Sequence, residues 1–292
     1  MRRFPILLGA LFMAACGRPA GVQDNIIYVS IAPLKYMVEQ IADTTVSVRV
    51  LVPETSSPET FEPTVQQITR LADARAYIAI GLIDFEHTLR GSVMSVAPDI
   101  SYLDLSQGIS VLEGSCSHNH SAGEHGHNHL VDPHIWLSPS IMGTIAQKIT
   151  RQMAELRPEH ETEYYARLDL LTASIDSLDR YIRQSFADLS NRSFAIGHPS
   201  LTYYAHDYGL TQIPIEMDGK EPGLQQMKTT VDLLRSKGIT TILTQQQTSA
   251  AAAEAVAREM AGRVVLFDPL AEKWLANMYY LTDLLSNSMS GK

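Results

Sequence analysis

A histidine held between prolines is the residue of this chain best suited to binding a metal ion. His134 lies in the segment Asp132-Pro133-His134-Ile135-Trp136-Leu137-Ser138-Pro139. Proline restricts its own φ and biases the preceding residue towards extended conformations, so this segment is expected to be rigid. A rigid imidazole on a loop is a preorganised metal ligand, whereas a lone histidine is more often a hydrogen-bonded core residue. Further histidines nearby and three more candidate ligands favour the metal interpretation.

The three other candidate ligands are each adjacent in sequence to a proline, as His134 is. They are Glu59, His198 and Asp268. Two neutral imidazoles and two carboxylates offset the charge of a divalent cation. Nitrogen and oxygen donors at four positions suit Zn²⁺, with Mn²⁺ or Fe²⁺ as alternatives. A closed shell of four protein ligands leaves no open position for an activated water, which favours holding an ion over catalysis.

The sequence around these residues alternates between strand-like and helical segments, which predicts an α/β fold with mostly parallel sheets flanked by helices. Strands of the first half are expected at residues 26–31, 46–52, 77–80 and 100–103. Strands of the second half are expected at residues 192–196, 212–215, 240–244 and 264–267. Each candidate ligand lies in a loop that follows a strand. Ligands of open α/β sheets bind at the carboxyl ends of strands, so we expect the four side chains to meet in a cleft between two lobes.

One long helix is predicted between the two halves. Apolar residues recur there at intervals of three and four: Leu168, Leu171, Ile175, Leu178, Ile182, Phe186 and Leu189. About thirty residues at 1.5 Å each make a rod of roughly 45 Å. We therefore expect a first lobe at 25–157, a linking helix at 158–190 and a second lobe at 191–292. An ordinary surface helix of the second lobe is the alternative interpretation.

A histidine-rich stretch precedes the His134 segment. It supplies five of the ten histidines of the chain: His118, His120, His125, His127 and His129. The stretch has no periodic apolar face, so a loop is predicted over 115–130. We interpret these five side chains as an auxiliary, weaker metal site, because flexible ligands lose conformational entropy on binding. A solvated insertion without function is the alternative.

The first residues have the features of a secretory signal. Arg2 and Arg3 precede an apolar run that ends near residue 15, too short to cross a bilayer. The segment Met13-Ala14-Ala15-Cys16-Gly17 resembles the bacterial lipoprotein box, although Met13 stands where leucine is usual. We expect a signal peptide at 1–15, lipidation of Cys16 and a tether at 16–24. The protein is then anchored on the periplasmic, extracytoplasmic side of a bacterial membrane, and Cys116 is left without a partner for a disulfide.

Composition limits the partners of the chain. Its 292 residues suffice for two domains with their own cores, and its formal net charge is −9. An acidic surface argues against nucleic acid or anionic lipid as a partner and suits a protein that handles cations. We expect a monomer.

Four ordered motifs resemble one family, the zinc and manganese substrate-binding proteins of bacterial ABC importers. They are Ser57-Pro58-Glu59-Thr60-Phe61-Glu62-Pro63-Thr64, the His134 segment, Gly197-His198-Pro199-Ser200 and Phe267-Asp268-Pro269-Leu270. The resemblance extends from about Asn25 to the C-terminus. It implies two lobes joined by a long helix, a metal ion between them, and delivery of that ion to an ABC permease with its ATPase. A histidine-rich loop, and His198 where manganese proteins usually have glutamate, imply zinc as the transported ligand.

One departure from the family concerns Glu59, which stands where the family normally presents histidine. A carboxylate still binds zinc, but it favours Mn²⁺ or Fe²⁺ as the transported ion more than a histidine would. Glu62 is a weaker candidate ligand, and Glu86 matches a family position that supports the cleft.

Two other functions remain open. A zinc hydrolase needs an open coordination site and a general base, but the chain contains no HExxH, GxSxG or phosphate-binding loop. A surface adhesin that uses zinc structurally is the other.

Overall fold

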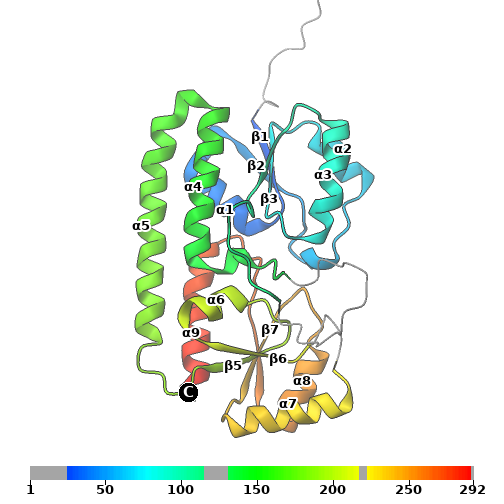
Figure 1. Ribbon diagram of the computed structural model, residues 1–292, viewed down its shortest axis with the longest axis vertical. Coiled ribbons are helices and arrows are strands. Elements are labelled where there is room, and N and C mark those ends of the chain that lie inside the picture. The colour runs from blue at the N-terminus through cyan, green and yellow to red at the C-terminus, as the bar shows by residue number, and fades with distance from the viewer. Residues whose placement is uncertain (1–24, 115–130, 217–221, 291–292) are drawn as a thin grey trace, which may run out of the picture.

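The computed structural model describes residues 25–114, 131–216 and 222–290 (Figure 1). The predicted signal peptide, the tether with Cys16, and the histidine-rich loop with its five histidines and Cys116 lie outside the described residues. None of the helices in the described ranges combines the length and the apolar character that crossing a lipid bilayer requires.

The first lobe is built on a parallel sheet of four strands in the order β2-β1-β3-β4. The strands are β1 Ile26–Val29, β2 Ser47–Val50, β3 Ala76–Ala79 and β4 Ser101–Asp104. Every residue of the central strands β1 and β3 is buried, whereas the edge strands are partly exposed. The helices of this lobe are α1 Ala32–Ala42, α2 Val65–Leu71 and α3 Asp84–Val96. Continuous apolar strands covered by helices are typical of parallel sheets.

The second lobe repeats this topology with a parallel sheet in the order β6-β5-β7-β8. Its strands are β5 Ser193–Ile196, β6 Thr211–Pro214, β7 Thr241–Thr244 and β8 Arg263–Leu266. Its helices are α6 Thr202–Tyr208, α7 Leu224–Ser236 and α8 Ala251–Glu259. The predicted α/β architecture with two parallel sheets is confirmed. The loops at the carboxyl ends of both sheets face the region between the lobes, where Figure 1 shows the two halves meeting.

The long helix α5, Glu161–Ser185, runs beside both lobes (Figure 1). It packs against α1, against α4 (Pro139–Leu156) and against α9 (Trp274–Met289) through a stripe of buried apolar residues. Its 25 residues make a rod of about 38 Å, shorter than the predicted one. The regular helix is shorter because Pro158–His160 forms a 3-10 turn and because Phe186, which is buried, caps the other end.

A continuous apolar core joins the two lobes in addition to the long helix. One cluster of buried side chains contains Ile27 of β1, Phe194 of β5 and Phe267 after β8. A polar contact also crosses between the lobes, from Lys35 of α1 to Glu272 at 2.9 Å. Separating lobes that share a core exposes apolar surface, which is unfavourable. The geometry therefore favours movement of loops over a large hinge motion.

Candidate metal centre

Glu59 is presented by the loop that connects β2 to α2. The loop begins with Leu51 and Val52, whose backbone N–H groups still bond to Val29 and Ser30 of the neighbouring strand segment. It ends at Thr64, which caps α2 through a reciprocal pair of hydrogen bonds with Gln67. Between these anchors, Pro58–Thr60 forms a 3-10 turn that carries Glu59. The Glu59 side chain is 35% exposed, so this loop forms the open side of the site.

His134 is held by the residue two positions before it. The Asp132 carboxylate accepts hydrogen bonds from the His134 backbone N–H and from Nδ1, both at 2.8 Å. The turn Ile135–Leu137 follows, and Ser138 caps α4 by accepting from the Ile141 N–H. Only 7% of the His134 side chain is exposed. With Nδ1 bonded to a carboxylate, the imidazole is oriented so that Nε2 is available to an ion.

His198 belongs to the second lobe and, like His134, lies in a loop with a carboxylate near its Nδ1. It follows β5, and the Gly197 N–H before it bonds to the Leu243 carbonyl of the adjacent strand segment at 2.7 Å. His198 Nδ1 lies 3.4 Å from Oε2 of Glu216, which follows β6. Carboxylates thus occupy the Nδ1 side of both imidazoles.

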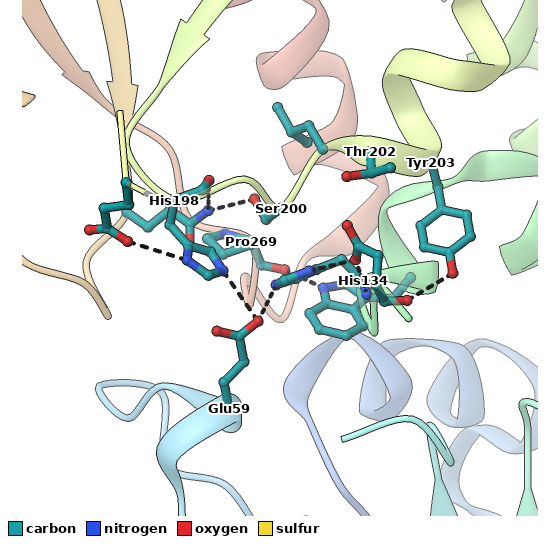
Figure 2. Close-up of polar contacts among 12 residues, drawn as sticks. Glu59, His134, His198, Ser200, Thr202, Tyr203 and Pro269 are labelled. Atoms are coloured by element: carbon teal, nitrogen blue, oxygen red, sulfur yellow. Dashed lines mark hydrogen bonds and ion pairs between the residues drawn. The ribbon is translucent and has the colours of Figure 1, made fainter. Parts of the chain in front are cut away.

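The three side chains meet in the crevice between the lobes. Oε1 of Glu59 lies 3.6 Å from Nε2 of His134 and 3.2 Å from Nε2 of His198. Figure 2 shows Glu59 rising from the first lobe towards the two imidazoles. One ligand atom of each residue lies within 4.8 Å of the others, a spacing at which a single ion contacts all three. The structure therefore brings residues 59, 134 and 198 together from three separate loops.

Electrostatic interactions within this group are strong. Burial opposes the charging of Glu59, but the hydrogen bond with His198 and attraction to both imidazoles lower its pKa to about 2. Burial likewise opposes a charge on His198, but hydrogen bonds and attraction to Glu216 and Glu59 raise the pKa of His198 to about 10. The crevice therefore places a carboxylate beside an imidazole on which positive charge is favoured, and the same electrostatic environment suits a divalent cation.

Asp268 lies outside the group of three. It follows β8 as predicted and is half-buried, but its Oδ1 accepts hydrogen bonds from Gln247 Nε2 at 3.0 Å and from the Leu270 N–H at 2.9 Å. The assignment of Asp268 as a fourth ligand stays a prediction.

The other two glutamates considered from the sequence have separate places. Glu62 is exposed on the loop surface. Glu86 is buried, and its carboxylate accepts hydrogen bonds from Ser30 Oγ and from the N–H groups of Ile80, Gly81 and Ile83. Glu86 thus joins the end of β3 to the start of α3.

Sequence reasoning missed the two carboxylates that orient the imidazoles. Asp132 was visible as part of the His134 segment, but only the folded loop shows its carboxylate against Nδ1. Glu216 directly follows the segment expected as a strand at 212–215, so the strand-end rule that identified His198 also applied to it. Its role depends on β5 and β6 being neighbours in the sheet.

The cavity at this place is small. Its volume is about 10 Å³, and its lining includes the three ligand residues together with Trp136, Gln247 and Leu270. Such a space accommodates an ion or a single water.

Comparison with known proteins identifies one family. The profile of the family described as ZnuA, zinc-uptake complex component A, periplasmic, matches residues 27–288. The structure is similar to the crystal structure of ZnuA, with a TM-score of 0.83 and 35% sequence identity, covering 91% of this chain and 99% of the other.

Two streptococcal proteins are also similar in sequence. The zinc-binding protein AdcA of Streptococcus pyogenes serotype M3 is 26% identical over 236 residues, which cover 76% of this chain and 46% of that protein. The zinc-binding lipoprotein AdcA of Streptococcus pneumoniae is 23% identical over 285 residues, covering 92% and 56%. The chain thus spans about half the length of these two relatives.

Proposed function

Because the chain belongs to the family of periplasmic zinc-uptake complex components, as its four motifs predicted, we propose that it is the metal receptor of an ABC importer. It captures Zn²⁺ in the crevice between its lobes and delivers the ion to a membrane permease. The observation that carries this proposal is the convergence of Glu59, His134 and His198 from both lobes, with ligand atoms within 4.8 Å of one another.

The chemistry of the donor set supports zinc as cargo. Two imidazole nitrogens and a carboxylate oxygen are ligands that Zn²⁺ accepts readily, and Asp268 is the predicted fourth. Asp132 and Glu216 lie against Nδ1 of the imidazoles and fix their orientation, which leaves Nε2 of each ring to face an ion. Mn²⁺ or Fe²⁺ at the same site is the second candidate, favoured only by the carboxylate of Glu59 in place of an imidazole.

Transport rather than catalysis suits the donor set. A hydrolase needs an open coordination position and a general base beside the metal. Glu86 is buried and its carboxylate is engaged by backbone N–H groups, so it is not free to act as a general base. The protein therefore functions as a binding component and leaves ATP hydrolysis to its partners.

The remaining parts of the proposal come from the sequence. The histidines at 118, 120, 125, 127 and 129 collect metal ions at lower affinity, and a lipid on Cys16 keeps the monomeric receptor at the extracytoplasmic face of the membrane. Deleting residues 115–129 is expected to leave the cleft affinity intact, and loss of that affinity contradicts a collecting role.

Competitive metal titration of the purified protein tests the function. The wild type is expected to bind one Zn²⁺ tightly in preference to Mn²⁺, and His198→Ala to lose that tight binding. The same titration on Glu59→His examines the departure from the family. If the wild type prefers Mn²⁺ and this variant prefers Zn²⁺, the transported ion is Mn²⁺ and Glu59 sets that preference. Absence of tight binding of either ion by the wild type refutes it.

A further inference from the structure

Three consecutive glutamines follow β7 at the edge of the metal centre. In the sheet order β6-β5-β7-β8, the loop after β7 lies between the loop of His198 after β5 and the loop of Asp268 after β8. Gln245 is buried and donates from Nε2 to Ser200 Oγ, and Gln246 is exposed. Gln247 turns inwards again and lines the cavity with the three ligand residues.

The side-chain amide of Gln247 connects the two lobes. Its Nε2 donates to the backbone carbonyl of Glu54 at 2.9 Å and to Oδ1 of Asp268 at 3.0 Å. Glu54 belongs to the first-lobe loop that carries Glu59, five positions further along. One amide thus joins the loop of a ligand from the first lobe to a carboxylate of the second.

The orientation of this amide is set by its two acceptors. Exchanging its oxygen and nitrogen would place Oε1 against a carbonyl oxygen and a carboxylate oxygen, which is unfavourable. In the observed orientation, Oε1 is buried and has no hydrogen-bond partner among the described residues. The connection is therefore specific in direction.

The exposure of the ligands indicates where the site opens. The side chain of Glu59 is 35% exposed, whereas those of His134 and His198 are 7% and 10% exposed. Both histidines are held by carboxylates within their own lobes, and a continuous apolar core joins the lobes. An ion that leaves the crevice therefore leaves past Glu59, and movement of its loop breaks the bond between Gln247 and Glu54.

We propose that Gln247 is a latch that holds the Glu59 loop against the second lobe and thereby sets the rate at which the bound metal leaves. Gln247 is a positioning residue, because it acts through the Glu59 loop and through Asp268. The inference rests on the proposed function, since it requires a metal ion at Glu59, His134 and His198.

The test is the rate of Zn²⁺ release from the full protein into an excess of chelator. Gln247→Ala is expected to accelerate release about tenfold, equivalent to about 1.4 kcal/mol. Gln247→Met, which keeps the volume of the side chain, is expected to do the same and replaces the alanine variant if that one folds poorly. Gln246→Ala, at the exposed neighbour, is the matched control and is expected to release Zn²⁺ at the wild-type rate.

A double-mutant cycle separates a latch from a merely structural residue. In a Glu59→Ala background, the latch has no ligand to hold, so adding Gln247→Ala is expected to change the release rate by less than about twofold. An equal acceleration in both backgrounds overturns the proposal, and so does an unchanged rate in the single variants.

A second measurement needs no metal. Amide hydrogen exchange at residues 54–61 of the metal-free protein is expected to quicken in Gln247→Ala and not in Gln246→Ala. Unchanged exchange in the Gln247 variants overturns the latch even if the wild type binds Zn²⁺ tightly. A wild type that fails to bind Zn²⁺ at all refutes the proposed function, and the latch with it.

Discussion

Trp274 donates its indole N–H to the backbone carbonyl of Trp136, at 2.8 Å across the boundary between the two lobes. Trp136 in turn donates its own indole N–H to the carbonyl of Pro269, at 2.9 Å. The segment that presents His134 and the segment that presents Asp268 are therefore held together by two buried aromatic side chains. A loop of each lobe is therefore held by the same pair of indole hydrogen bonds.

Replacing Trp274 with phenylalanine removes this donor and leaves the buried Trp136 carbonyl without its partner. The free energy of unfolding is expected to fall by about 2–4 kcal/mol, from the unpaired carbonyl and from lost aromatic packing. Urea denaturation measures it. Tyr280→Phe is the control on the same helix, because Tyr280 is 48% exposed and its change is expected to stay within about 0.5 kcal/mol. Equal stabilities of the two variants would show that the indole contact contributes nothing.

The carboxylates behind the imidazoles are expected to control affinity. Asp132→Asn and Glu216→Gln remove the negative charge facing Nδ1 of His134 and His198, so each is expected to weaken Zn²⁺ binding about tenfold or more. Competition with a chromogenic chelator measures the affinities. Glu62→Gln, on the exposed part of the Glu59 loop, is the control with the same change of charge and is expected to bind as the wild type does. Equal losses in all three variants indicate a general charge effect instead.

Metal removal is expected to lower stability through linkage. An ion that binds the folded state alone stabilises it by about 2.7 kcal/mol at a free concentration one hundred times the dissociation constant. The melting temperature is therefore expected to rise with added Zn²⁺ and to return to the metal-free value with a chelator. His198→Ala serves as the comparison, and a Zn²⁺-dependent rise of the same size in this variant would place the stabilising site elsewhere.

The stability of the metal-free protein is expected to depend on pH through Glu86. Burial raises the pKa of Glu86 to about 7 from an ordinary value of 4.5, against hydrogen bonds from Ser30 and from backbone N–H groups. At a pH between these two pKa values, Glu86 is protonated in the folded state and ionised in the unfolded chain. Stability from this group is therefore fully present below about pH 4.5 and lost as the pH rises to about 7, by about 3 kcal/mol in total.

The measurement is the free energy of unfolding across this window in Glu86→Gln and in Asp84→Asn. Glu86→Gln is expected to be less stable overall, because its amide meets backbone N–H donors, and to lack this part of the slope. Asp84→Asn, an exposed neighbour on α3, is expected to keep the slope. If the free energy of unfolding of Glu86→Gln still falls with pH across this window, the pH dependence comes from other groups.

Much of the fold could be predicted from local patterns. Buried strands such as β1 and β3 are short apolar runs between turn residues, and α5 has an apolar stripe at helical spacing, so both appear in the sequence. The ends of α5 were less predictable, because a proline at 158 supports either an α-helical or a 3-10 start, and Phe186 ends the helix only where the core receives its ring.

For the site, the sequence by itself determined which side chains are ligand candidates. Glu59, His134 and His198 follow strands and lie beside prolines, and both features are readable along the chain because they depend on neighbouring residues. Only the tertiary structure decided which atoms meet. The carboxylates of Asp132 and Glu216 face Nδ1, and the side chain of Gln247 donates to Asp268. These relationships depend on a few ångströms between segments far apart in sequence, and packing of the two lobes on a shared core sets such distances.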